Sequence, residues 1–238
     1  MSAPHFFAAD VTGDRVTLTG EDARHAAKVL RIRPGEVITV SDGAGTVVRA
    51  SVESASVELV ASVTERWTDP AIEPAIQVFQ AIPKAGKLDL VVQKLTELGA
   101  DVIQPFPASR SVARWDDEKA AAQTERLAAI ARESSKQSRR SRLPEVRAPA
   151  PLGSLDLPAC TVVLDAEAER RVRDVFPADP PPAIGLVIGP EGGLDGDELR
   201  LLESRGAVPA TLGPLVLRTE TAALAAVAVI ASRYGRLG

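Results

Sequence analysis

The N-terminal part of the chain alternates between apolar and polar positions, which is the pattern of half-buried β-strands. The strand-like segments are residues 15–19, 36–40, 46–52 and 57–63. Asp42-Gly-Ala-Gly45 separates two of them and has the composition of a hairpin turn. One short helix is predicted from Asp22 to about Arg31, ahead of Pro34 and Gly35. Several short strands that close on themselves predict a small β-barrel.

A different pattern begins after the proline-containing break at residues 68–74. Short apolar runs alternate there with longer helical segments. The runs are residues 76–82, 102–106, 161–164, 184–188 and 207–212, and the longest helices are residues 88–98 and 116–137. This alternation predicts an α/β domain with a mostly parallel sheet flanked by helices. We therefore expect two domains, residues 1–70 and 74–238.

The last two apolar runs each end in a loop that contains glycine. One run leads into Gly189-Pro-Glu-Gly-Gly193, and the other leads into residues 213–221. A helix follows each loop: Asp195 and Glu198 form a capping-box pattern before the first, and the second is expected from about Thr221 to Tyr234. Glycine-bearing loops at the carboxyl ends of parallel strands are typical of ligand sites. The alternative is a pair of ordinary strand-to-helix turns.

The composition of the chain limits the kinds of binding site and catalytic site that it can form. The 28 basic and 32 acidic residues give a net charge of −4, so contact with a nucleic acid would need a local basic patch. Cys160 is the single cysteine, and His5 and His25 are the two histidines, which excludes an internal disulfide and a Cys/His zinc site. We expect no metal. The chain begins without a signal-peptide pattern, and its longest apolar stretch is too short to span a membrane, so a soluble cytoplasmic protein is expected.

Gly189-Pro-Glu-Gly-Gly193 and the following LGPLVLRTETAAL segment, residues 212–224, resemble the ribosomal small-subunit uridine-N3 methyltransferases of the SPOUT superfamily. His25-Ala-Ala-Lys-Val-Leu-Arg31 is similar to a stretch of that family's N-terminal PUA-like barrel. The resemblance covers almost the whole chain. It implies a SPOUT-type trefoil knot in the C-terminal sheet, S-adenosylmethionine as methyl donor, and a homodimer. The chain departs from the family at Pro4 and His5, where members commonly carry arginine.

The resemblance also implies which residues hold the cofactor. They are Leu164, Ile188, Gly189, Pro190, Glu191, Gly192, Gly193, Leu212, Gly213, Leu215, Val216, Leu217 and Thr219. Backbone groups of the two loops would contact the cofactor, and the aliphatic side chains would form apolar walls. The alternative is that these side chains are core residues at strand ends.

Arg218 and Glu220 are the catalytic candidates. N3 of a neutral uracil carries a proton, so the protein must remove that proton and stabilise the developing anion. Our hypothesis is that Arg218 stabilises the anion and Glu220 accepts the proton, with Glu191 and Glu133 as alternative acceptors. The alternative makes Glu220 a first-turn helix residue favoured by the helix dipole, with Thr219 or Thr221 as the helix cap.

A basic run at residues 126–147 holds seven basic and two acidic residues, and it aligns in part with the family's E-x-x-x-Q-x-x-R-x-R pattern. Such a run is either an RNA contact or a solvated helix face. The RNA-binding candidates are His25, Arg31, Lys84, Lys87, Lys94, Glu133, Gln137, Arg139, Arg140 and Arg142. For Lys94, an exposed ion pair with Glu97 is the alternative.

The resemblance therefore implies a methyltransferase that acts on N3 of a uridine in 16S ribosomal RNA. One alternative keeps the fold and changes the target to another base, a ribose hydroxyl or another RNA. A second alternative is a non-catalytic RNA-binding assembly protein, which would have no use for the methyl donor.

Overall fold

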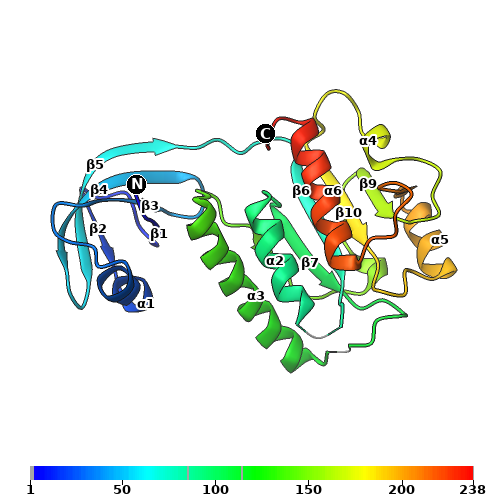
Figure 1. Cartoon of the computed structure of the whole chain (residues 1–238), viewed down its shortest axis with the longest axis horizontal. Coiled ribbons are helices and arrows are strands. Elements are labelled where there is room, and N and C mark those ends of the chain that lie inside the picture. The colour runs from blue at the N-terminus through cyan, green and yellow to red at the C-terminus, as the bar shows by residue number, and fades with distance from the viewer. Residues whose placement is uncertain (1–2, 85, 114, 238) are drawn as a thin grey trace. The chain divides into compact units, whose positions relative to one another are not determined.

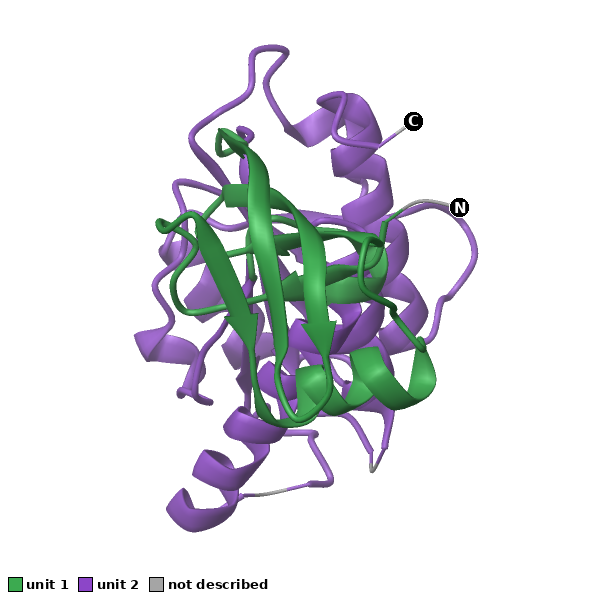
Figure 2. Cartoon of the chain, turned by 90° about the vertical axis from the view of Figure 1, so that its left-hand side faces the viewer, with its two compact units in different colours: residues 1–71, 135–143 green, residues 72–134, 144–238 purple. Residues whose placement is uncertain are grey.

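The chain folds as two compact units in a computed structural model that describes residues 3–84, 86–113 and 115–237. The first unit comprises residues 1–71 and 135–143, and the second comprises residues 72–134 and 144–238 (Figure 2). Each unit has its own hydrophobic core. The segment 135–143 joins the first unit although it lies far along the chain.

The first unit is a five-stranded sheet in the order β1-β3-β4-β5-β2. Its strands are β1 (His5–Phe7), β2 (Arg15–Leu18), β3 (Val37–Ser41), β4 (Thr46–Ala55) and β5 (Leu59–Thr68). β1 pairs with β3 in parallel, and the other pairs are antiparallel. The predicted turn between β3 and β4 is confirmed: a carboxylate oxygen of Asp42 accepts the N–H groups of Ala44 at 2.7 Å and Thr46 at 3.0 Å.

The predicted helix of the first unit starts and ends two residues earlier than expected. α1 (Gly20–Arg24) continues into one π-helical turn, η1 (His25–Val29), so the expected end at Arg31 is wrong. Arg31 adopts a left-handed conformation with φ of 54°, and the next N–H, that of Ile32, donates to the carbonyl of Ala26 at 3.0 Å. This reversal buries Ile32 in the core, a packing gain that periodicity alone does not reveal.

The segment 135–143 closes over the first unit through hydrogen bonds to its strands and turn. Ser41 donates through its hydroxyl to the carbonyl of Ser141 at 2.6 Å, and the N–H of Leu143 donates to the carbonyl of Gly43 at 2.9 Å. His5 lies buried beneath it, with ring nitrogens 2.9 Å from Thr39 Oγ1 and 3.2 Å from the carbonyl oxygen of Arg140. Burial lowers the pKa of His5 below its ordinary value, so the ring is neutral and structural at neutral pH.

The second unit is built on a six-stranded sheet in which every pair is parallel, in the order β11-β9-β10-β6-β7-β8. The strands are β6 (Ala75–Ala81), β7 (Val102–Phe106), β8 (Glu145–Val146), β9 (Cys160–Leu164), β10 (Ala183–Ile188) and β11 (Val208–Ala210). The predicted parallel α/β sheet is confirmed. β11 is shorter than the predicted run of residues 207–212.

Helices and turns cover both faces of this sheet. They are α2 (Lys87–Glu97), α3 (Asp117–Ser138), η2 (Leu152–Ser154), α4 (Val172–Val175), α5 (Gly196–Ser204) and α6 (Thr219–Arg233). α2 and α6 lie side by side on one face (Figure 1), where Val92, Leu95 and Val227 pack on strand residues such as Val78 and Leu186. α5 packs through Leu202 on the opposite face, with Phe79 and Val187. α3 spans the expected residues, and its last residues, from Ser135 on, belong to the first unit.

The two C-terminal helices begin in different ways. Asp195 caps α5 with the predicted capping box: its carboxylate accepts the N–H of Glu198 at 2.9 Å, and Glu198 accepts the N–H of Asp195 at 2.9 Å. α6 begins at Thr219, two residues before the predicted start. Its N-cap is Arg218, which makes no side-chain cap, so the prediction that Thr219 or Thr221 caps the helix is wrong. In the described part of the chain, no helix has the length and apolar character needed to cross a membrane.

Candidate active site

The carboxyl ends of four neighbouring strands lie at one level of the sheet in the second unit. Ile188 pairs with Gln80 on β6 and with Leu164 on β9, and Leu164 pairs with Ala210 on β11. β10 leads directly into residues 189–193, which we call the first glycine loop. β11 leads into residues 211–218, which we call the second glycine loop. The parallel sheet thus brings both predicted loops to the edge where α/β proteins bind ligands.

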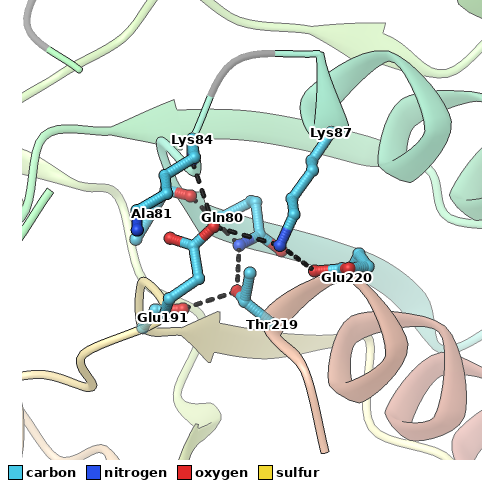
Figure 3. Close-up of polar contacts among 8 residues, drawn as sticks. Gln80, Ala81, Lys84, Lys87, Glu191, Thr219 and Glu220 are labelled. Carbon is cyan, nitrogen blue, oxygen red and sulfur yellow. Dashed lines mark hydrogen bonds and ion pairs between the residues drawn. The ribbon is translucent and has the colours of Figure 1, made fainter. Parts of the chain in front are cut away.

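A buried chain of hydrogen bonds ties the two loops together. The hydroxyl of Thr219, at the start of α6, donates to the carbonyl of Gly189 at 2.6 Å. The side-chain amide of Gln80 donates to Thr219 Oγ1 at 2.9 Å and to the carbonyl of Ala81 at 3.1 Å (Figure 3). Gln80 is fully buried and Thr219 nearly so. Since Thr219 uses its single proton on Gly189, the first residue of α6 fixes the position of the first glycine loop.

Gln80 was not predicted from the sequence, although a signal was present. It is the one polar residue within an otherwise apolar buried run, Val78-Phe-Gln-Ala-Ile82. A buried amide needs hydrogen-bond partners, and the strand end is where a site supplies them. Its Oε1 is buried and has no partner among the described residues.

We predict that Thr219→Val weakens this link. The substitution keeps the shape of the side chain and leaves the carbonyl of Gly189 and one N–H of Gln80 without a partner. Buried groups left in this state cost about 1–3 kcal/mol of the free energy of unfolding. Thr219→Ser, which keeps the hydroxyl, is the matched control. Urea unfolding of both variants checks the prediction, and equal stabilities would contradict it.

Close contacts and hydrogen bonds fix the backbone of the first glycine loop. A Cβ on Gly189 would lie 3.1 Å from the backbone nitrogen of Leu194 and 3.3 Å from the carbonyl carbon of Gly193. Gly193 has a φ of 71°, and its N–H donates to the carbonyl of Pro190 at 2.9 Å. Arg110, which follows β7 and was not predicted, donates to the carbonyl of Gly192 at 2.8 Å. The loop therefore has a fixed backbone path that glycine makes possible.

The second glycine loop exposes apolar side chains. Leu215 is 77% exposed and Val216 is 85% exposed. Leu217 is half-buried, and Pro214 and Arg218 are exposed. The other predicted wall residues behave differently: Ile188 is buried in the core, and Leu164 and Leu212 are half-buried and pack against it. The aliphatic set therefore divides into core residues and residues that face solvent.

Three charged side chains meet where the first glycine loop and the start of α6 approach α2. The ammonium of Lys87 donates to Glu191 Oε1 at 3.2 Å and to Glu220 Oε2 at 3.1 Å (Figure 3). The backbone N–H of Lys84 donates to the same oxygen of Glu191 at 3.2 Å. These four residues were predicted to have three different roles, and the structure brings them together.

Both carboxylates of this cluster are stabilised in their charged forms. Partial burial tends to raise the pKa of Glu191 and the pKa of Glu220, and hydrogen bonds outweigh it, so both pKa values lie below their ordinary value. The bonds come from each residue's own N–H and from Lys87, together with the N–H of Lys84 for Glu191. The pKa of Lys87 is raised, first by Glu220 and then by Glu191. The cluster holds two carboxylates and one ammonium at neutral pH.

The RNA-binding candidates do not gather at this cluster. Lys84 and Lys87 lie at it, whereas Lys94 forms the ion pair with Glu97, at 2.8 Å, that was the alternative interpretation. Glu133 is exposed on the part of α3 in the second unit. The remaining candidates lie in the first unit: His25, Arg31, Gln137 and Arg139 are exposed, and Arg140 is half-buried.

Arg142 has a structural role in the first unit. Its guanidinium donates to the carbonyl of Asp69 at 2.9 Å and lies against Gly45, where a Cβ would be 2.4 Å from Nη2. Other members of the basic run pair with acidic residues, among them Lys136 with Asp22 and Arg126 with Asp89. Part of the predicted concentration of positive charge is thereby neutralised.

Residues 71–231 match an RNA methyltransferase domain family, and residues 18–61 match an RNA methyltransferase PUA domain family. The chain is 40% identical over 240 residues to ribosomal RNA small subunit methyltransferase E of Mycobacterium bovis, covering 94% of this chain and 89% of that protein. The chain belongs to the ribosomal RNA small subunit methyltransferase E family. Its relative in Bacillus subtilis is 34% identical over 226 residues, covering 90% and 88% of the two chains.

A solved structure of a methyltransferase E family member from Neisseria gonorrhoeae, bound to S-adenosyl methionine, superposes with a TM-score of 0.88. It is 29% identical and covers 98% of each chain. The predicted SPOUT-type α/β fold with a PUA-like N-terminal domain is confirmed. The knotted path of the chain stays a prediction from the resemblance.

Proposed function

We propose that this protein transfers a methyl group from S-adenosylmethionine to N3 of a uridine in 16S ribosomal RNA. Membership of the methyltransferase E family supports the reaction class, and the gonococcal relative, solved with S-adenosyl methionine, supports the donor. The observation that carries the proposal is the buried link from Gln80 through Thr219 to Gly189, which holds both glycine loops at the carboxyl edge of the sheet.

The residues at this edge fit the proposed cofactor. Leu215 and Val216 present apolar side chains that no part of the described chain covers, which suits the face of an adenine ring. The backbone N–H groups of Leu215, Val216 and Leu217 donate no hydrogen bond within the described residues. A ligand with several acceptors would use both features, and Gly189 lets the backbone approach it closely.

The bound cofactor supplies an activated methyl group, so the protein's residues need only align the base, take its proton and stabilise its charge. We propose that Arg218, which is exposed immediately before α6, stabilises the developing uracil anion. We propose that Glu220 accepts the N3 proton, because its carboxylate is ionised at neutral pH. Glu220 directly follows Thr219 in the first turn of α6, so the proton acceptor is adjacent to the residue that links the two glycine loops.

We predict that Arg218→Ala lowers kcat by about 100-fold, which is the usual effect of removing one donor to a developing anion. The affinity for small ribosomal subunits changes little, because the residue acts in the transition state. Single-turnover methylation and subunit binding, measured separately, check this. A variant that kept full turnover and lost only RNA affinity would contradict the catalytic role.

Several further assignments belong to this proposal. Residues 1–70 act as the RNA-binding domain and residues 74–238 as the methyltransferase domain. The exposed His25, Arg31, Gln137 and Arg139 of the first unit are the RNA contacts we favour, together with Lys84 of the second unit. The protein works in the cytoplasm as a homodimer. A mass measurement in solution checks the last point, because a monomer at micromolar concentration would contradict it.

The proposed function is tested by methyl transfer from labelled S-adenosylmethionine to small ribosomal subunits that lack their native methylations. Nucleoside analysis of the product is expected to show a single 3-methyluridine. Another methylated nucleoside would keep the enzyme class and overturn the target. No transfer to subunits or to naked ribosomal RNA, together with no binding of the cofactor, would favour a non-catalytic RNA-binding protein.

A further inference from the structure

We propose that Lys87 is a positioning residue of the methyl-transfer site, whose ammonium holds Glu191 of the first glycine loop and Glu220 of α6 in fixed places. This inference rests on the proposed function, because it concerns how the site for that reaction is assembled. It differs from the role predicted for Lys87 in the sequence analysis, which was contact with RNA phosphate.

The geometry carries the proposal. Lys87 is the first residue of α2, Glu191 lies in the loop after β10, and Glu220 lies in the first turn of α6. One ammonium reaches both carboxylates, at 3.2 Å and 3.1 Å, so it connects three elements that are far apart in sequence. The side chains of the three residues are between 14% and 28% exposed, which places the contacts in partly desolvated surroundings.

Burial strengthens these contacts relative to surface ion pairs. Exposed pairs contribute little because water and salt screen them, whereas a partly buried ammonium between two carboxylates is screened less. Without the ammonium, two like charges would remain close together beside the first glycine loop. Repulsion would then separate the loop from α6, or one carboxylate would take up a proton.

The charged surroundings of Glu220 come from every element at the site. They are Lys87 on α2, Glu191 in the first glycine loop, which shares the same ammonium, and Arg218 before α6. Lys87 is the charged group that bonds directly to the Glu220 carboxylate, which also accepts its own backbone N–H. Together with that N–H, Lys87 therefore holds the carboxylate in place and favours its charged form.

Three variants test the proposal: Lys87→Met removes the charge, Lys87→Arg keeps it, and Lys119→Met removes an exposed lysine of the same unit as a matched control. In the cofactor-free protein, ¹³C NMR titration of glutamate carboxyls, assigned with Glu220→Gln, follows Glu220 directly. We expect the pKa of Glu220 to rise in Lys87→Met and to stay near the wild-type value in the other two variants.

The same variants are then assayed for methyl transfer to small subunits over a range of pH. We expect kcat/KM of Lys87→Met to fall between about 10-fold and 100-fold, as misplacement of reacting groups does. Its acid limb should move to higher pH, and Lys87→Arg should recover most of the activity. Subunit affinity and its dependence on salt should not change.

Two results would overturn the inference. One is that Lys87→Met leaves both the pKa of Glu220 and the rate of methyl transfer at their wild-type values. The other is a loss of subunit affinity with a smaller salt dependence and unchanged kcat, which would make Lys87 a phosphate contact. Wild-type protein that methylates nothing would count against the proposed function instead, and the NMR titration would still test the role of Lys87. Circular dichroism of each variant verifies that it folds.

Discussion

Gly189→Val is expected to abolish most of the methyl-transfer activity, lowering kcat/KM by about 100-fold. The Cβ of any residue at this position would lie 3.1 Å from the backbone nitrogen of Leu194 and 3.2 Å from its Cγ. Valine adds two methyl groups to that Cβ, so the first glycine loop must move. The carbonyl of Gly189 would then lose its bond from Thr219, and with it the alignment of the two loops.

Gly196→Ala is the matched control for this substitution. Gly196 begins α5, and a Cβ there would meet only the guanidinium end of Arg200, at 3.4 Å, which can move aside. Isothermal titration of S-adenosylmethionine and methyl-transfer kinetics compare the two variants. Wild-type affinity in Gly189→Val, or an equal loss in Gly196→Ala, would contradict the account of the loop.

Arg236→Ala should lower the free energy of unfolding of the second unit by about 3 kcal/mol. Only 7% of the Arg236 side chain is exposed, and its guanidinium bonds to Asp101 at 2.8 Å and to the carbonyl of Gly99 at 2.8 Å. It also donates to the carbonyl of Pro74, at the start of β6. Truncation leaves Asp101 without its cation, and Asp101 in turn accepts the N–H of Ile76 at 2.8 Å.

Arg200→Ala is the control for this prediction. Arg200 also pairs with an aspartate, Asp197, and both side chains are largely exposed, so its removal should cost less than about 1 kcal/mol. Urea unfolding can follow the fluorescence of Trp115, which packs on the core of the second unit, in a Trp67→Phe background. Equal losses of unfolding free energy in the two variants would show that the buried bonds of Arg236 stabilise the unit no more than an exposed ion pair does.

The elements of the fold follow closely from local sequence. The parallel sheet, the long helix α3 and the capping box of α5 were all predicted, because apolar periodicity and capping residues act over a few positions. The start of α6 was predicted two residues late. Thr219 resembles a helix cap in sequence, but its hydroxyl is committed to Gly189, thirty residues away, and such a contact leaves no local pattern.

The site was predicted less completely for the same physical reason. The two glycine loops were visible in the sequence because glycine marks special backbone positions. Gln80 and Arg110 were missed, since their importance depends on carbonyl groups that only the folded sheet brings near them. Arg142 was predicted as an RNA contact from the basic run and the family pattern, and the structure shows its guanidinium against Gly45 and the carbonyl of Asp69. Charge counts cannot distinguish a solvated arginine from one used for packing.

Our main proposal is that the two glycine loops, joined by Thr219, form one site for the methyl donor. Its most direct test is a ¹⁵N–¹H NMR titration of the protein with S-adenosylhomocysteine, the demethylated product of the donor. We expect saturable chemical-shift changes concentrated in residues 189–194 and 211–219, and their loss in Gly189→Val. Binding that shifts other residues and leaves both loops unchanged would contradict it.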